Sequence, residues 1–281
     1  MRFRKIYLEI SNICNLHCSF CHGTKRAPKM MTKEELSSVL PKIRPYTDYL
    51  YFHLMGEPLC HPQLEDLLAL AGELGFRVII TTNGVLVGKK KEILLSAPSL
   101  HKVNISLHSF EANDLPMPFE EYLENCLEFG KTASESSQKI IVYRLWNKGG
   151  KDALNNDILD AVLKKFPSAD NTYGKKRGMK LAERVYLEYG EKFDWPDLAA
   201  SNMGEEVFCY GLRDQLGILC DGTVVPCCLD CEGDINLGNI FEDSMESILS
   251  SERARAIYDG FSNRHATEEL CRRCGYATRF K

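Results

Sequence analysis

The sequence predicts an α/β fold in which a partial barrel of six strand-helix units precedes a small cysteine-rich domain. The first observation is that strand-like segments of period two alternate with helix-like amphipathic segments from Lys5 to Tyr189. Such alternation is typical of a parallel sheet with helices outside it. The second observation is that seven of the twelve cysteines follow residue 200. We therefore expect two domains, residues 1–200 and 201–281.

The six units follow one another with few interruptions. Strands are predicted at Lys5–Ser11, Asp48–Met55, Phe76–Thr82, Lys102–Ser109, Lys139–Trp146 and Arg184–Tyr189. Helices are predicted from Thr32 to before Pro45, and at Pro62–Gly75, Lys89–Ser96, Phe119–Ala133 and Asp152–Phe166. Thr32 and Glu35 have the spacing of a capping box, which marks the start of the first helix. Right-handed crossovers roll parallel strands of this kind into an open or closed barrel.

The two faces of the predicted strands differ in polarity. In Lys102–Ser109, Val103, Ile105 and Leu107 share one face, and the opposite face is more polar. The apolar faces require contact with the helices, so the polar faces should line the interior. The residues expected there are Glu9, His53, Ser106, His108, Arg144 and Glu188. Because a complete eight-stranded barrel fills its centre with aliphatic side chains, this polar lumen predicts a wider, partial barrel that admits a ligand.

Charge and hydropathy exclude several classes of protein. A net charge of -4 and a pI near 6.0 provide no broad basic surface, which argues against a nucleic-acid or anionic-membrane partner. We interpret the basic stretch Lys175-Lys176-Arg177 as a solvated loop. No apolar run approaches the roughly 18 residues of a membrane span, and the N-terminus lacks the pattern of a signal peptide. A cytoplasmic protein is therefore expected.

Three cysteines, Cys14, Cys18 and Cys21, follow the first predicted strand with the spacing C-x3-C-x2-C. Clustered cysteines in a reducing compartment are more often metal ligands than disulfides. A structural zinc site and an ordinary iron–sulfur cluster each need four protein ligands. A loop with three thiols therefore predicts a metal centre with one open position, where chemistry can occur.

This loop, with the aromatic Phe20 just before its last cysteine, resembles the radical S-adenosylmethionine (radical SAM) superfamily. The resemblance implies a [4Fe-4S] cluster on Cys14, Cys18 and Cys21 whose free iron binds the amino acid end of SAM. It also implies that Gly56, Glu57 and Pro58, after the second strand, grip SAM, although Met55 stands where many members have a further glycine. The carboxylate of Glu57 could accept a hydrogen bond from an ammonium group. The resemblance adds further SAM contacts at Phe20, His22, Asn83, Ser106, His108 and Arg144.

The loop has two alternative interpretations. Cys18 to His22 has the C-x-x-C-H pattern of c-type haem attachment, which is disfavoured without an export signal. A zinc site with His17 or His22 as fourth ligand would leave the Gly56–Pro58 and Thr82–Gly84 turns unexplained. The zinc interpretation corresponds to a non-enzymatic scaffold or interaction module.

The segment after Ser201 has a different character. Asp221-Gly222 predicts a hairpin turn, and a small segment of this kind needs a metal to stabilise it. The cysteine pattern resembles the SPASM and twitch auxiliary-cluster domains of radical SAM enzymes, which implies one auxiliary [4Fe-4S] cluster on Cys209, Cys227, Cys271 and Cys274. No thiol occurs between Cys231 and Cys271, so two auxiliary clusters are not expected. Cys220, Cys228 and Cys231 are then surplus, with a ligand role for one of them left open, and a zinc ribbon is the alternative for the four.

The resemblance also implies an activity. Reductive cleavage of SAM would give a 5′-deoxyadenosyl radical that abstracts hydrogen from a substrate in the lumen, with flavodoxin or ferredoxin as the electron donor. The expected substrate is a peptide or protein side chain. Dehydrogenation of a small alcohol or sugar-like metabolite is the second alternative and RNA modification the third. The sequence assigns no catalytic residue beyond the cofactor sites.

Overall fold

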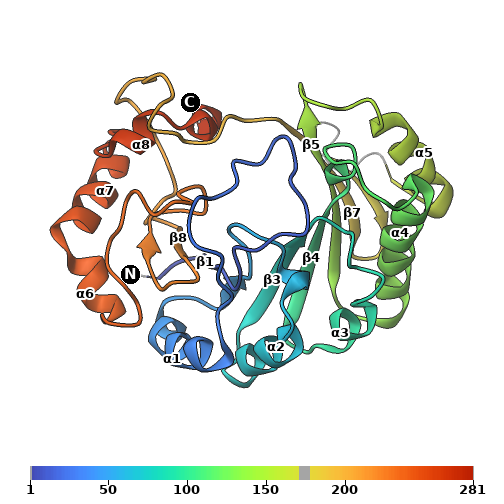
Figure 1. Ribbon diagram of the computed structural model, residues 1–281, viewed down its shortest axis with the longest axis horizontal. Helices are drawn as coiled ribbons and strands as arrows, with labels where there is room; N and C mark the ends of the chain where they lie inside the picture. Colours follow the sequence, from blue (N-terminus) through green and yellow to red (C-terminus); the bar gives the residue numbers. More distant parts are fainter. Residues whose placement is uncertain (1, 171–177, 281) are drawn as a thin grey trace.

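The computed structural model describes residues 2–170 and 178–280, and the basic stretch Lys175–Arg177 lies outside them. The chain forms a curved sheet with helices along its outer rim (Figure 1). The strands are β1 (Lys5–Leu8), β2 (Tyr49–Tyr51), β3 (Arg77–Thr82), β4 (Leu100–Ser106), β5 (Ile140–Lys148), β6 (Gly178–Ala182), β7 (Val185–Glu191), β8 (Gln215–Ile218) and β9 (Val224–Val225).

The sheet has the strand order β6-β7-β5-β4-β3-β2-β1-β8-β9. The six predicted strands correspond to β1 to β5 and β7, and all of their mutual pairings are parallel. Antiparallel strands lie at the two edges, β6 beside β7 and β9 beside β8. Within the described ranges β6 and β9 do not pair with each other, so the barrel is open. The predicted α/β partial barrel is confirmed.

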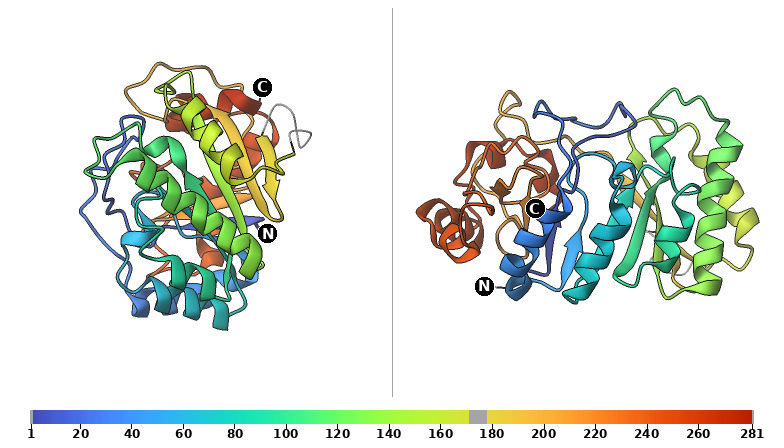
Figure 2. Two further views of the ribbon diagram at one scale, coloured as in Figure 1. Left: turned by 90° about the vertical axis from the view of Figure 1, so that its right-hand side faces the viewer. Right: turned by 60° about the horizontal axis from the view of Figure 1, so that its bottom comes forward.

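The helices cover the convex side of the sheet (Figures 1 and 2). They are α1 (Lys33–Ile43), α2 (Leu64–Glu73), α3 (Lys91–Ser96), α4 (Phe119–Ser136), α5 (Asn155–Lys165), α6 (Met245–Ser250), α7 (Glu252–Ser262) and α8 (Glu269–Arg272). Among the described residues, no helix combines the length and the apolar character needed to cross a bilayer.

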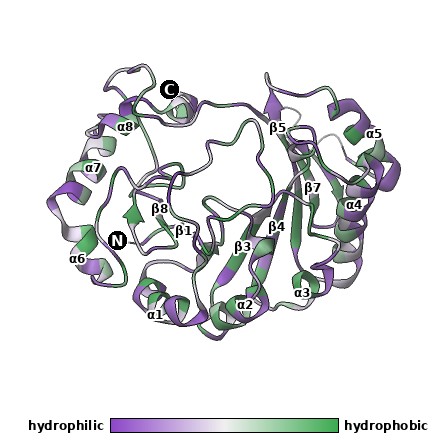
Figure 3. Ribbon diagram, viewed as in Figure 1, coloured by the Kyte–Doolittle hydropathy of each residue, from purple (hydrophilic) through white to green (hydrophobic). Residues whose placement is uncertain are grey.

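The first helix shows how local sequence and packing agree. Thr32 Oγ1 accepts a hydrogen bond from the Glu35 N–H at 3.1 Å, and Glu35 Oε2 accepts one from the Thr32 N–H at 2.8 Å. This is the predicted capping box. On the buried side of α1, Leu36 and Leu40 join the same apolar core as Ile6 of β1. In Figure 3 the helices carry both hydrophilic (purple) and hydrophobic (green) residues, as expected for elements with one apolar face.

The strand boundaries and one strand differ from the prediction. β2 covers three residues of the predicted Asp48–Met55, because the chain leaves the sheet where it forms the Gly56 turn. β6 was not predicted. It reaches β7 through a tight turn in which Arg184 has a φ of 61°. α5 begins at Asn155 rather than Asp152.

The segment after residue 200 continues the sheet. The predicted hairpin is present, since Gly222 at φ 88° lies in the turn between β8 and β9. β8 then pairs in parallel with β1, from Lys5 with Gln215 to Leu8 with Ile218. The C-terminal helices α6, α7 and α8 lie beyond this hairpin, away from α3 to α5 (Figure 1). The hairpin thereby places the C-terminal cysteines at one side of the lumen.

Candidate functional site

The lumen of the barrel is polar, as the strand alternation predicts. Glu9, which was expected there, is instead fully buried in an ion pair with Arg26 and lines no cavity of the lumen among the described residues. Val103, Ile105 and Leu107 are fully buried in the core shared with the helices. On the other face, Ser106, Arg144 and Glu188 occupy matching positions on β4, β5 and β7. The register therefore sets a row of polar groups across three strands of the lumen.

The three cysteines of the N-terminal loop lie near the carboxyl end of β1. Cys14 and Cys21 are exposed and Cys18 is half-buried. Each sulfur accepts an N–H group: Cys14 Sγ from Leu16 N at 3.4 Å, Cys18 Sγ from Asn113 Nδ2 at 3.2 Å, and Cys21 Sγ from Gly23 N at 3.4 Å. Although Cys14 is exposed as a residue, the protein around its sulfur desolvates the thiolate and raises the pKa of Cys14 to about 11, against the Leu16 N–H, which lowers it.

The Gly56 turn packs directly under this loop. Gly56 has a φ of 73°, and a Cβ at this position would lie 2.9 Å from Ile13 O. Glu57 is buried, and its carboxylate accepts hydrogen bonds from Leu59 N at 3.0 Å and Asn83 N at 2.7 Å. Burial raises the pKa of Glu57 to about 7. The Glu57 carboxylate therefore connects the segments that follow β2 and β3. These two segments lie beneath the cysteine loop and support it.

Asn83 connects this floor to the loop. Its Nδ2 donates to Asn15 Oδ1 at 2.8 Å and contacts Cys14 Sγ at 3.9 Å. Its carbonyl oxygen accepts from the Tyr122 hydroxyl at 2.8 Å. Gly84 follows with a φ of 88°, where a Cβ would collide with Tyr122 and Cys126. The predicted Gly56–Pro58 and Asn83 elements thus lie together beneath the cysteine loop.

A cavity of about 610 Å³, which we call the outer cavity, opens beside the cysteine loop. Its size is in the range of small-molecule sites. Four of the predicted SAM contacts line it: Phe20, Ser106, His108 and Arg144. The other predicted contacts do not line it among the described residues; these are His22, Gly56, Glu57, Pro58 and Asn83.

Two aromatic contacts shape the outer cavity. The rings of Phe20 and His108 lie 4.9 Å apart between centroids, and His108 Nδ1 lies 3.0 Å from the Arg144 carbonyl oxygen. Burial lowers the pKa of His108 to about 4, so its imidazole is neutral at pH 7. The Arg144 guanidinium lies 4.4 Å from the centroid of Trp146. These contacts present flat, apolar surfaces next to the exposed thiols.

Trp195 closes the cavity from the segment that joins the two predicted domains. Its Nε1 donates to the Phe20 carbonyl oxygen at 3.1 Å, and its ring stacks on His22 at 6.1 Å between centroids. His22 is thus placed against Trp195 rather than on the cavity wall.

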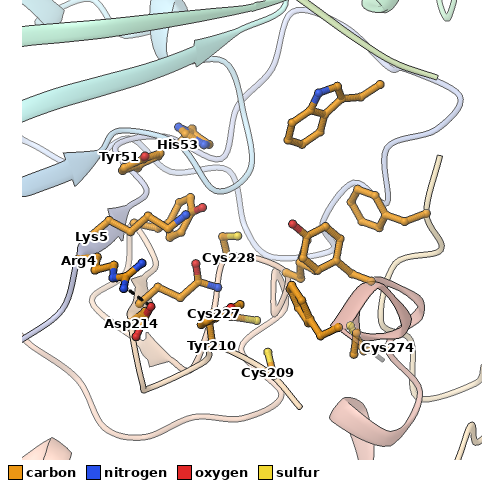
Figure 4. Close-up of a pocket in the computed structure, with 18 of the residues that line it drawn as sticks. Arg4, Lys5, Tyr51, His53, Cys209, Tyr210, Asp214, Cys227, Cys228 and Cys274 are labelled. Atoms are coloured by element: carbon orange, nitrogen blue, oxygen red, sulfur yellow. Dashed lines mark ion pairs between the residues drawn. The ribbon is translucent and has the colours of Figure 1, made fainter. Parts of the chain in front are cut away.

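A second cavity, which we call the inner chamber, measures about 450 Å³. It shares six lining residues with the outer cavity: His53, Arg144, Trp146, Phe193, Cys228 and Leu229. Figure 4 shows Lys5 and Tyr51 on one side of the chamber and Cys209, Cys227 and Cys274 on the other. The inner chamber therefore lies between the outer cavity and the C-terminal cysteines.

The four predicted C-terminal ligands meet around a small apolar cavity of about 30 Å³. Cys209, Cys227, Cys271 and Cys274 all line it, together with Asp230 and apolar side chains. Burial raises the pKa of Cys209 to about 11, with a smaller opposing effect of the Gly211 N–H, and burial also raises the pKa of Cys227, Cys271 and Cys274. Buried thiols become thiolates only beside a positive charge such as a metal centre.

The three surplus cysteines have different positions. Cys220 and Cys231 are buried and line none of the three cavities, within the described part of the chain. Cys220 Sγ contacts an Arg26 guanidinium nitrogen at 3.8 Å, and Cys231 Sγ lies 3.6 Å from the Gly23 carbonyl oxygen. Cys228 lines the outer cavity and the inner chamber, next in the chain to Cys227.

Both cysteine sets fit iron–sulfur clusters. The three N-terminal thiols are exposed or half-buried, and each accepts an N–H donor, the kind of contact that tunes cluster sulfurs. The C-terminal thiols are four and enclosed. Among the described residues, no three His, Cys, Asp or Glu side chains are close enough to bind one metal ion. A tetrahedral structural zinc site is closed by four protein ligands, which the three N-terminal thiols alone do not supply.

Several site residues were not identified from the sequence. Trp146 follows Arg144 by two residues and shares its strand face, so alternation alone could have placed it in the lumen. The same holds for Lys5 and Tyr7 on β1. Trp195 and Phe193 lie in an irregular segment, where no periodic pattern marks them. Asn113, which donates to Cys18, also lies in a loop.

Comparison with known proteins agrees with this geometry. The radical SAM superfamily model matches residues 8–145, and the SPASM model, an iron–sulfur cluster-binding domain, matches residues 209–275. The sporulation killing factor maturation protein SkfB of Bacillus subtilis (strain 168) is 24% identical over 270 residues. That alignment covers 88% of this chain and 64% of SkfB, so the chain spans less than two thirds of that relative.

Solved structures share the fold. BtrN in complex with AdoMet and 2-DOIA has a TM-score of 0.57 at 17% identity, covering 98% of this chain and 93% of BtrN. Streptococcus suis SuiB bound to the precursor peptide SuiA has a TM-score of 0.64 at 17% identity, covering 98% of this chain and 70% of SuiB. With both cysteine sets lying inside the matched ranges, the chain belongs to the radical SAM superfamily and carries a C-terminal SPASM iron–sulfur cluster-binding domain.

Proposed function

We propose that this chain is a radical SAM enzyme that modifies a peptide or protein side chain held in the inner chamber. When bound, the N-terminal cluster and SAM supply a 5′-deoxyadenosyl radical that abstracts a hydrogen atom from the substrate. Cys14, Cys18 and Cys21 hold that cluster, and Cys209, Cys227, Cys271 and Cys274 hold one auxiliary [4Fe-4S] cluster.

One observation carries the proposal: the outer cavity and the inner chamber adjoin, with the three-thiol loop at one end and the four-thiol site at the other. A substrate in the inner chamber lies between SAM and a second cluster. Phe20, Ser106, His108 and Arg144 orient SAM in the outer cavity. Trp146, Phe193 and Trp195 exclude water from the path between the two, which protects a reactive species from side reactions.

Two relatives support the choice of a peptide. SkfB is named as a maturation protein, and SuiB is described with a bound precursor peptide. The second candidate is dehydrogenation of a small alcohol or sugar, favoured by the volume of the chamber, which is within the small-molecule range.

Anaerobic reconstitution tests the activity. The protein should bind about eight iron atoms, as two four-iron clusters require, and should form 5′-deoxyadenosine from SAM with dithionite or with reduced flavodoxin or ferredoxin. Peptide and metabolite fractions are then offered separately, and mass changes identify the class that is modified. Zinc content without SAM cleavage would contradict the proposal.

A further inference from the structure

The inner chamber contains more positive than negative side chains. Lys5 and Arg144 line it. Lys102 lies near both: burial is the largest cause that lowers the pKa of Lys102, and the charges of Arg144 and Lys5 lower it further, whereas Glu188 raises it. At the mouth, Arg4 and Asp214 pair with each other at 3.3 Å. Glu188 lies near Arg144 and Lys102, and Asp214 acts on Lys5 as well as on Arg4, so two carboxylates face four cations among the described residues.

Lys5 reaches into the chamber without a carboxylate partner. Its Nζ lies 5.0 Å from the ring centroids of both Tyr7 and Tyr51, and among the described residues it forms no ion pair. Figure 4 shows its side chain extended from the side of β1 toward the centre of the chamber. The ammonium group is therefore held over two aromatic rings, with its donors available to a ligand.

Arg144 and His53 present buried polar atoms that lack partners. Within the described part of the chain, Arg144 Nε and His53 Nδ1 have no hydrogen-bond partner. The nearest carboxylate oxygen to Arg144 Nε belongs to Glu188, at 3.8 Å, which exceeds hydrogen-bond distance. An unsatisfied buried donor on a charged group costs free energy that a bound anion recovers.

We propose that the inner chamber binds a carboxylate group of the substrate between Lys5 and Arg144. This inference rests on the proposed function and names the chemistry of its substrate. The walls also include the rings of Tyr210, Tyr276, Phe193 and Phe280, which favour a carboxylate on a short apolar stem, such as that of a glutamate side chain. A peptide or a small dicarboxylic acid could supply this group.

Equilibrium dialysis of the reconstituted full chain with SAM tests this directly. The peptide probes are Ac-Ala-Ala-Glu-Ala-Ala-NH2 and the same peptide with Gln, which differ in charge and hardly in shape. The small-molecule probes are glutarate and glutaramide. The variants are Lys5→Met, which keeps an apolar stem, and Lys33→Met, which makes the same charge change on the exposed start of α1.

The charged probes should bind at least about tenfold more tightly than their amides, and Lys5→Met should remove this difference while Lys33→Met preserves it. A tenfold change corresponds to about 1.4 kcal/mol. Preference for the Glu peptide over glutarate identifies a peptide source, and the reverse identifies a small acid; either supports the proposal.

Equal affinity for charged and neutral probes would overturn it and would leave Lys5 as a counter-charge for the neighbouring thiolates. SAM cleavage is measured on the same unmodified preparation. Loss of cleavage there counts against the proposed function, whereas equal probe affinities count against the carboxylate site alone.

Discussion

The two cysteine sets of this protein differ in their spacing along the chain and in how far the protein encloses their thiols. Cys14, Cys18 and Cys21 come from one loop of eight residues, and their thiols are exposed or half-buried beside a cavity. Cys209, Cys227, Cys271 and Cys274 come from segments up to 65 residues apart and enclose an apolar cavity. The first set is accessible from a cavity, and the second is enclosed by protein.

This difference affects what each site needs from the fold. The N-terminal loop is supported from below by the Gly56 turn and by Glu57, so it can present its thiols without metal. The C-terminal site joins chain segments that are distant in sequence, from Cys209 to Cys274. A metal bound there contributes directly to folding. The N-terminal cluster should therefore control activity, and the C-terminal cluster should control both stability and activity.

The largest expected effect is the loss of SAM cleavage in Cys14→Ala. Removing one of the three ligands should eliminate the N-terminal cluster. The iron content should then fall from about eight to about four atoms per chain, and 5′-deoxyadenosine should no longer be formed. The thermal unfolding midpoint of the apo protein should not change, because Cys14 is exposed. Cys60→Ala is the matched control and should keep both the iron and the activity. A variant that still cleaves SAM would show that Cys14 is not a ligand.

Cys271→Ser should affect the C-terminal four-cysteine site. Loss of the auxiliary cluster should destabilise residues 201–280 by several kcal/mol, since structural metal sites contribute folding free energy. Hydrogen exchange should then show lost protection in α7 and α8, with β3 to β5 remaining protected. Cys231→Ser, whose thiol lies outside the four-thiol cavity, is the control. If the iron content is unchanged in Cys271→Ser, the closed site has been assigned wrongly.

Arg26→Met tests a contact between the N-terminal part of the sheet and the C-terminal segment. Arg26 forms a 2.7 Å ion pair with the fully buried Glu9, and its Nε donates to the Cys231 carbonyl oxygen at 2.7 Å. Glu9 also accepts from Met55 N and Cys220 N. Leaving this carboxylate unpaired should cost about 3–5 kcal/mol of unfolding free energy, measured by urea denaturation.

The control for this pair is Lys33→Met, which breaks the exposed pair with Asp66 and should cost less than about 1 kcal/mol. Equal effects of the two substitutions would mean that the Glu9–Arg26 contact does not connect the regions energetically.

Asn113→Ala should give the smallest effect. Asn113 Nδ2 donates to Cys18 Sγ at 3.2 Å, and its Oδ1 accepts from His17 N at 3.0 Å. Partners of this kind tune metal affinity by about 10–100-fold. Iron retention against a chelator should therefore weaken at the N-terminal site, with the auxiliary cluster unaffected. Equal weakening at both sites would indicate a general loss of structure.

Much of the architecture could be predicted because it depends on local patterns. The period-two strands, the Thr32–Glu35 capping box and the Asp221-Gly222 turn each depend on a few neighbouring residues. β6 was not predicted although Met179 and Leu181 alternate with half-buried neighbours, because a five-residue edge strand beginning with glycine gives only a short local pattern and depends on its pairing with β7. The bounds of β2 also depend on the Gly56 turn, which packs against a distant loop.

The sequence by itself determined the cysteine sets, the order of the six parallel strands with the helices between them, and the polar lumen. These features follow from spacing and periodicity, which act along the chain. Only the tertiary structure decided that β8 pairs with β1, that Trp195 closes the outer cavity, and that Lys5 and Arg144 meet in one chamber without a matching set of carboxylates. Such contacts join residues far apart in the chain, and their energies depend on burial that no local pattern encodes.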